Sequence, residues 1–234
     1  MITGKVIAMV LIAGFALANV IGGAIGMRSY FPLMRQIWRG FLRPLRVLEV
    51  LGAMTITIAF LVLLFNLHPV FKWGWWALIK QGVVAGERGS DNTGGNILLA
   101  PATEAATSDI PILQAVALSF FLLLLFAMPF FAYMEEEAFR WGHNDKKSML
   151  KQSIKFGLIH LLVGVPIGGG IVLIFMGLFY HWKYLSSFRK FSEMGYDYWE
   201  AEGKAIIVSA TYHSLFNSIL VAFPLVLTML LMFF

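Results

Sequence analysis

The chain has 234 residues, of which 59% are hydrophobic and only 13% are charged. A soluble domain carries about 25% charged residues, so this composition excludes a surface that meets water on all sides and predicts a multi-pass integral membrane protein. The chain contains no cysteine, which excludes a disulfide framework, a thiolate nucleophile and a cysteine-ligated metal. The net charge of +5 does not indicate nucleic acid as a partner, because the basic residues lie in short segments between apolar runs.

The first two apolar runs cover residues 6–27 and 47–67, and each is long enough for a helix to cross a hydrocarbon core of about 30 Å. We expect the first run to be a retained span, because it is long for a signal peptide and no convincing cleavage site follows it. The segment between the runs contains arginines and no acid, which predicts a cytoplasmic loop and an external amino terminus. These arginines are Arg28, Arg35, Arg39, Arg43 and Arg46. Glu49 is expected at the interface beside Arg46.

The next segments are an interfacial helix, a loop and a third span. Residues 71–84 contain three tryptophans and two lysines, a composition typical of a helix that lies in the membrane interface. Residues 86–109 are rich in glycine, asparagine and threonine and are expected to form an external loop. The run over 110–134 then returns the chain to the cytoplasm, where Arg140 and several lysines follow.

Residues 154–180 allow two interpretations. The stretch is long enough for a single span, but the glycines and the proline of residues 164–170 favour a break. We therefore favour one helix over 147–165, with a face of lysines spaced four apart, and a second helix over 170–182.

A charged loop over 183–204 and a last span over 205–234 complete the chain. The result is a polytopic all-α transmembrane bundle of about six spans, with one interfacial helix and both termini outside. It forms a single domain, residues 1–234. The alternative with five spans places the carboxyl terminus in the cytoplasm.

Acidic side chains at the end of the third span indicate a polar site, because such groups are costly at membrane depth. Glu136 and Arg140 lie four residues apart on one helix face with the acid first, an order that favours an ion pair. Glu135 points about 100° away from Glu136 on a helix, so Arg140 need not hold it. The alternative is that Glu135, Glu136 and Glu137 are solvated acids that cap the span.

Two histidine motifs follow in later apolar runs. Phe156 and His160 lie four residues apart, as do His213 and Asn217. Asn217 is placed to hold one ring nitrogen of His213 in a fixed tautomer and to leave the other nitrogen free. Measured from the nearest preceding lysines, the two histidines lie about 8 and 14 Å into the membrane from the cytoplasmic side. All three polar groups are therefore expected to meet.

The motifs exclude several reactions and leave two open. The sequence has no His-Glu-x-x-His motif, no Gly-x-Ser-x-Gly motif and no aspartate inside a predicted span. A desolvated glutamate near histidines is able to act as a general base on water, while a histidine and an asparagine donate to the developing oxyanion. Equally, Glu135, His160 and His213 are candidate ligands for a divalent metal such as zinc, with water as the fourth ligand.

The order Glu-Glu-x-x-x-Arg, Phe-x-x-x-His and His-x-x-x-Asn on successive membrane helices resembles the CAAX protease and bacteriocin-processing family of intramembrane proteases. That family includes the type II CAAX prenyl endopeptidases. The resemblance covers roughly residues 131–220. It implies an intramembrane endopeptidase in which Glu135 activates water and Glu136 is held by Arg140.

The resemblance also assigns the remaining motif residues. It implies that His160 helps to place the water, and that His213 and Asn217 bind the oxyanion. No cofactor is favoured, although zinc stays possible; we prefer the metal-free route because only His213 has an obvious orienting partner in the sequence.

The same resemblance implies the partners and the location. The expected partners are the lipid bilayer and a membrane-anchored peptide or protein substrate, with or without a lipid group. The site is expected to face the cytoplasm, in a bacterial inner membrane or another energised membrane. The alternative function is a non-catalytic membrane adaptor or an immunity-type protein of the same family.

Overall fold

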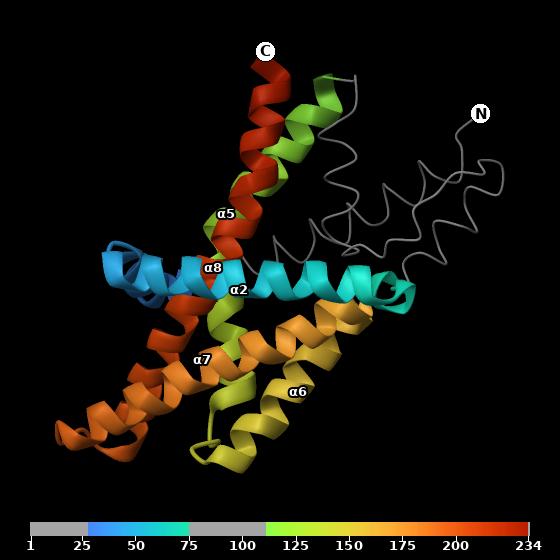
Figure 1. The fold of residues 1–234 in the computed structure, drawn as a ribbon. Coiled ribbons are helices and arrows are strands. Elements are labelled where there is room, and N and C mark those ends of the chain that lie inside the picture. Colours follow the sequence, from blue (N-terminus) through green and yellow to red (C-terminus); the bar gives the residue numbers. More distant parts are fainter. Residues whose placement is uncertain (1–27, 75–110, 234) are drawn as a thin grey trace.

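The computed structural model describes residues 28–74 and 111–233, and the regular elements in these residues are all helical. The helix over residues 28–41 comes first. It is followed by α2 (Pro44–Leu67), the short 3-10 helix η1 (Pro69–Lys72), α5 (Pro111–Arg140), α6 (Lys146–Leu162), α7 (Ile167–Glu193) and α8 (Tyr198–Phe233) (Figure 1). The predicted all-α class is confirmed. The expected span over 6–27, most of the expected interfacial helix and the loop over 86–109 lie outside the described residues.

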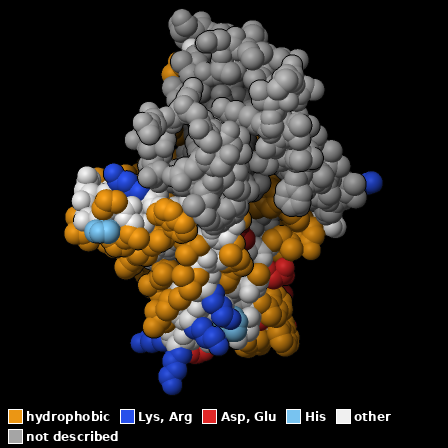
Figure 2. Space-filling view, turned by 90° about the vertical axis from the view of Figure 1, so that its right-hand side faces the viewer, with side chains coloured by type: hydrophobic (Ala, Val, Ile, Leu, Met, Phe, Trp, Pro, Cys, Tyr) orange, Lys and Arg blue, Asp and Glu red, His pale blue; other side chains and the backbone are white. Residues whose placement is uncertain are grey.

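Four helices in the described part are long and apolar enough to cross a membrane: Pro44–Leu67, Gln114–Arg140, Ile167–Glu193 and Tyr198–Phe223. Their outer faces carry many large apolar side chains, among them Leu48 at 64% and Phe223 at 75% exposure. On the face that Figure 2 shows, hydrophobic side chains cover much of the described part, and most of the visible lysines and arginines lie toward its lower end. A large exposed apolar surface is unfavourable in water, so this surface suits a lipid environment.

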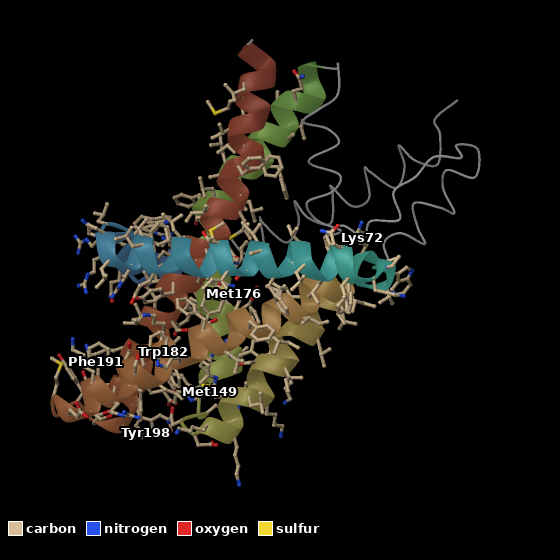
Figure 3. The ribbon with its side chains drawn as sticks, viewed as in Figure 1. Lys72, Met149, Met176, Trp182, Phe191 and Tyr198 are labelled. Atoms are coloured by element: carbon tan, nitrogen blue, oxygen red, sulfur yellow. The ribbon has the colours of Figure 1, made fainter. Side chains whose placement is uncertain are left out.

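The helices pack in antiparallel pairs. α5 lies along α8, and α6 and α7 form a hairpin that packs through α7 against α8 (Figure 1). α2 crosses α7 close to Met176, where the Thr57 hydroxyl lies 3.1 Å from the methionine sulfur (Figure 3). The core beneath this crossing is built largely of aromatic side chains, including Phe156 and Tyr180.

The predicted break between α6 and α7 is present, but it covers residues 163–166 and lies about three residues before the predicted position. α6 ends at Leu162 and α7 begins at Ile167. Between them, Gly164 has a φ of 87°, in the left-handed region that glycine adopts without strain. Pro166 follows; it lacks an amide hydrogen and directly precedes the first turn of α7. The favoured pair of helices is therefore confirmed, and the single span over 154–180 is wrong.

The predicted charged loop over 183–204 is also wrong, because most of it is helix. α7 continues to Glu193, and α8 begins at Tyr198. The turn between them contains Gly195, whose φ is 86°. The hydropathy of residues 183–204 did not indicate helices. Within this stretch Tyr184 and Ala201 are fully buried, so tertiary packing stabilises the helical structure here.

A short turn joins α5 to α6, and its last residue, Asp145, is the N-cap of α6. The Asp145 carboxylate accepts hydrogen bonds from the backbone amides of Lys147 at 2.8 Å and Ser148 at 2.9 Å, which caps the helix. The bonds from Ser148 hold the pKa of Asp145 below its usual value. Lys147, Lys151 and Lys155 are all exposed on α6, which agrees with the predicted lysine face.

Candidate active site

Glu136 and Arg140 form the predicted ion pair, and both side chains are fully buried. Arg140 Nε donates to Glu136 Oε2 at 3.1 Å, and Arg140 Nη2 donates to the carbonyl oxygen of Gly177 at 3.3 Å. The pair therefore ties α5 to α7. An ion pair without solvent contact is stable only when further hydrogen bonds satisfy its remaining polar atoms, and Glu136 has such bonds.

Two residues of α8 complete the surroundings of Glu136. His213 Nδ1 lies 2.9 Å from Glu136 Oε1, and the Ser209 hydroxyl contacts Glu136 Oε2. The same hydroxyl lies 2.9 Å from the carbonyl oxygen of Tyr180. Sequence reasoning missed Ser209, although its position four residues before His213 places it on the same face of α8.

His213 is oriented by Glu136 rather than by Asn217, so the expected partner was wrong. A carboxylate accepts but does not donate, so Nδ1 carries the proton and Nε2 of the neutral ring is left as an acceptor. The ring is also clamped: it stacks on Tyr180 with centroids 4.5 Å apart, and Phe156 meets it edge-on at 5.4 Å. Asn217 is half-buried one turn later on α8, and no hydrogen bond to it is found in the described part of the chain.

His160 is oriented in the same sense as His213. Its Nδ1 lies 2.6 Å from the carbonyl oxygen of Phe156, which is able only to accept, so Nδ1 again carries the proton. Its Nε2 therefore points away from its own helix and lies 3.9 Å from Glu135 Oε2. Phe156 thus fixes His160 through its backbone and contacts His213 through its ring.

Glu135 lies between the two histidines. Its Oε2 is 3.9 Å from His160 Nε2 and 3.7 Å from His213 Nε2. That oxygen is buried and has no hydrogen-bond partner among the described residues, although 38% of the side chain is exposed. The side chain of His160 is 21% exposed and that of His213 only 2%, so the site reaches the surface on the side of Glu135.

Glu137 lies apart from this constellation. Its carboxylate accepts a hydrogen bond from the Tyr133 hydroxyl at 3.1 Å, one helical turn away on α5. The three neighbouring acids therefore have three different surroundings. The structure brings Glu135, Glu136, Arg140, His160 and His213 together and leaves Glu137 out.

The two histidines lie far along α6 and α8 from the starts of these helices. α6 begins at Lys146 and α8 at Tyr198, so His160 and His213 follow roughly 14 and 15 residues into helices that start earlier than predicted. At 1.5 Å per residue these are path lengths of roughly 21 and 22 Å from the helix starts, whereas the expected 8 and 14 Å were measured from the nearest preceding lysines. Both histidines face Glu135 through Nε2.

The three atoms that face one another are spaced more widely than zinc ligands. Ligand bonds of about 2.0–2.1 Å in a tetrahedral site place neighbouring ligand atoms about 3.3 Å apart, whereas the distances to Glu135 Oε2 are 3.7 and 3.9 Å. Within the described residues, no three His, Asp or Glu side chains lie close enough to hold a metal ion. Both histidines do have an orienting partner, so the expectation that only His213 has one was wrong.

A second polar contact flanks the site and was not expected. Glu49 of α2 pairs with Lys183 of α7, Nζ to Oε1 at 2.8 Å, and its other oxygen accepts from the Tyr212 hydroxyl of α8. Lys183 Nζ also lies 4.4 Å from the centroid of the Trp182 ring and 4.6 Å from that of Tyr212. Glu49 thus binds α2 to the helices that hold His213, and its main partner is Lys183 rather than Arg46.

Comparison with protein-family models, with curated proteins and with solved structures finds no match for this chain. The geometry of the site is therefore the ground for the function proposed next.

Proposed function

We propose that the chain is an intramembrane endopeptidase that hydrolyses a peptide bond of a membrane-anchored substrate with water activated by Glu135. The observation that carries this proposal is the position of Glu135 Oε2, a buried oxygen without a partner that faces two imidazole nitrogens. A water molecule beside this oxygen comes within hydrogen-bond reach of all three groups. A buried acceptor of this kind, next to an opening, is a suitable general base.

The proposed reaction begins with proton transfer from water to Glu135. The water oxygen attacks the carbonyl carbon of the scissile peptide bond, and the carbonyl oxygen takes up the negative charge. Nε2 of His213, when protonated, and the Asn217 amide are the candidate donors to this oxyanion. Collapse of the tetrahedral intermediate breaks the C–N bond, and the proton held by Glu135 passes to the leaving amine.

Glu136 and Arg140 have a supporting role in this mechanism. Glu136 is bound by Arg140, His213 and Ser209 and has no exposure, so it is not free to take a proton from water. Its contact with Nδ1 fixes the tautomer and the ring direction of His213 and favours the protonated ring during the reaction. The order of these motifs is also the one that suggested the CAAX protease and bacteriocin-processing family.

The proposed setting is a multi-pass protein of an energised membrane, such as a bacterial inner membrane, with the site open to the cytoplasm. The arginines of residues 28–46 and the lysines of α6 support this orientation, because positive residues favour the cytoplasmic side. In Figure 1, the amino end of α2, the α5–α6 turn and the α7–α8 turn lie toward the left and bottom. The other ends of α2 and α8 and the α6–α7 turn lie toward the right and top.

The test is cleavage of single-span and lipidated peptide substrates by the purified protein in liposomes. The wild-type protein is expected to release a shortened product, and Glu135→Ala is expected to release none while it remains folded. Cleavage by Glu135→Ala at the wild-type rate contradicts the proposed base. A wild-type protein that cleaves no member of a broad substrate panel favours the non-catalytic adaptor instead.

A further inference from the structure

A second cluster of buried polar groups surrounds the turn that joins α5 to α6. At its centre is Glu202 of α8, which has no solvent exposure. Its Oε1 accepts hydrogen bonds from the Gly142 amide at 2.7 Å and the Tyr184 hydroxyl at 2.8 Å. Asn144 Nδ2 lies 3.5 Å from the same oxygen. One carboxylate oxygen therefore joins α7, α8 and the turn.

The backbone conformation of Gly142 directs its amide toward Glu202. Gly142 has a φ of 73°, a backbone conformation that residues with a Cβ rarely adopt. A Cβ at this position would meet nothing within 4 Å, so the backbone conformation, not the available space, calls for glycine. Gly142 follows Arg140, the last residue of α5, by two positions. The placement of the turn therefore sets the placement of the end of α5.

α7 holds the same turn from a second side. His181 is fully buried, and its Nε2 donates to the carbonyl oxygen of His143 at 2.8 Å. The amide of His143 in turn donates to the carbonyl oxygen of Arg140 at 2.9 Å. The end of α5 is thus fixed by contacts to both α7 and α8, at residues that lie outside the proposed catalytic group.

We propose that Glu202 is a positioning residue: it holds the α5–α6 turn against α7 and α8 and so fixes Arg140, which keeps Glu136 in contact with His213. Hydrogen bonds form one continuous path, from Glu202 to the turn, from the turn to Arg140, and from Arg140 to Glu136. The effect on catalysis rests on the proposed endopeptidase function, whereas the effect on the turn does not.

The chemistry of the donors predicts different effects for two substitutions of Glu202. The groups that bind Glu202 Oε1 are a backbone amide, a phenol and a side-chain amide, and all three are neutral. A glutamine carbonyl oxygen accepts the same hydrogen bonds, so Glu202→Gln is expected to retain the contact. Glu202→Ala removes it. The exposed Glu200, two residues earlier on α8, gives a matched control in Glu200→Ala.

The first measurement is hydrogen exchange of the amides of residues 141–145 in the purified full-length protein, which needs no substrate. Glu202→Ala is expected to exchange these amides about tenfold faster than wild type, because their local opening becomes easier, while Glu202→Gln and Glu200→Ala leave the rate unchanged. Unchanged exchange in Glu202→Ala overturns the proposal. Where Glu202→Ala does not accumulate, Tyr184→Phe removes one donor, and faster exchange of the same amides is again required.

The second measurement separates positioning from a purely structural role. Misplacement of catalytic groups lowers kcat more than it raises KM, so Glu202→Ala is expected to lose about tenfold or more in kcat with KM changed by less than about threefold. Glu202→Gln is expected to restore kcat. Equal loss in the Gln and Ala variants means that the hydrogen bonds to Oε1 are not sufficient for the role of Glu202, and this result overturns the proposal. A wild-type protein without cleavage activity refutes the proposed function instead, and the exchange result still decides whether Glu202 holds the turn.

Discussion

Adjacent glutamates on α5 meet different surroundings because a helix turns about 100° per residue. Glu136 points inward to Arg140, His213 and Ser209, whereas Glu135 points toward the surface with one buried oxygen left unpartnered. The first arrangement suits a fixed charge, and the second suits a group that exchanges protons with water. The sequence distinguishes the two glutamates only by their spacing to Arg140, and the structure confirms the Glu136–Arg140 ion pair.

Removal of Arg140 is expected to destabilise the protein as well as to inactivate it. Arg140→Ala leaves the buried Glu136 without its cation, and breaking a buried pair in this way costs about 3–5 kcal/mol. We expect a lower thermal midpoint and less folded protein in detergent. Arg189→Ala, which removes an exposed arginine of α7, is the matched control. A fully stable but inactive Arg140→Ala protein would make the arginine a direct contact of the substrate.

Metal removal tests how water is activated. Because the three candidate ligand atoms are spaced more widely than zinc ligands, we expect cleavage to persist after exhaustive chelation. The measurement is metal content of the purified protein together with the cleavage rate before and after chelation. Stoichiometric zinc, with activity lost on its removal and regained on its return, would make Glu135, His160 and His213 ligands.

At the scale of the helices, the close approach of α6 and α7 places His160. A Cβ added at Gly157 would lie 2.5 Å from the carbonyl oxygen of Gly170 and 2.4 Å from Ile174 Cγ1, so the two backbones meet through glycine. His160 follows Gly157 by less than one turn. The packing of α6 on α7 at Gly157 therefore helps to set the position of His160.

Gly157→Ala is therefore expected to destabilise the protein by about 1–3 kcal/mol through overpacking, although alanine alone favours a helix. The thermal midpoint and the cleavage rate should both fall. Gly52→Ala on α2 is the control, because a Cβ there meets nothing within 4 Å. A midpoint in Gly157→Ala equal to or above that of Gly52→Ala would show that the α6–α7 contact is looser than described.

Local sequence patterns predicted some features of the helices and missed others. The break before α7 and the Glu136–Arg140 pair depend on neighbours within one or two turns, so local spacing predicted them. The buried hydrogen bonds of Glu202, in the early part of α8 that hydropathy did not predict, join residues 18 and 60 positions apart, and local hydropathy contains no sign of them. Similarly, the orienting partner of His213 is Glu136 at a separation of 77 residues, not the nearby Asn217.

At the scale of the whole molecule, the α5–α6 and α7–α8 turns lie toward the same end and carry charged residues. This placement predicts the orientation of the chain in a membrane. α7 extends to Glu193, so the exposed Ser192 probes the α7–α8 turn, and the exposed Val70 in η1 probes the opposite end of α2. Because the chain has no cysteine, Ser192→Cys and Val70→Cys each carry a single label site. In intact cells an impermeant thiol reagent is expected to label Val70→Cys and not Ser192→Cys. The reverse pattern would place the α7–α8 turn outside and overturn the cytoplasmic site.

The claim on which the account depends is that Glu135, and not a neighbouring acid, activates the water. Its most direct test is the cleavage rate of Glu135→Gln and Glu137→Gln, compared in the same liposomes with the same amount of folded protein. Both changes keep the shape of the side chain and remove the ability to accept a proton as a carboxylate. General-base catalysis contributes about 10²–10⁴-fold, so the activity of Glu135→Gln is expected to fall by about that factor. Glu137 is hydrogen-bonded to Tyr133 and lies apart from the two histidines, so Glu137→Gln is expected to stay near wild type. Equal loss at both positions, or full activity in Glu135→Gln, would contradict the account.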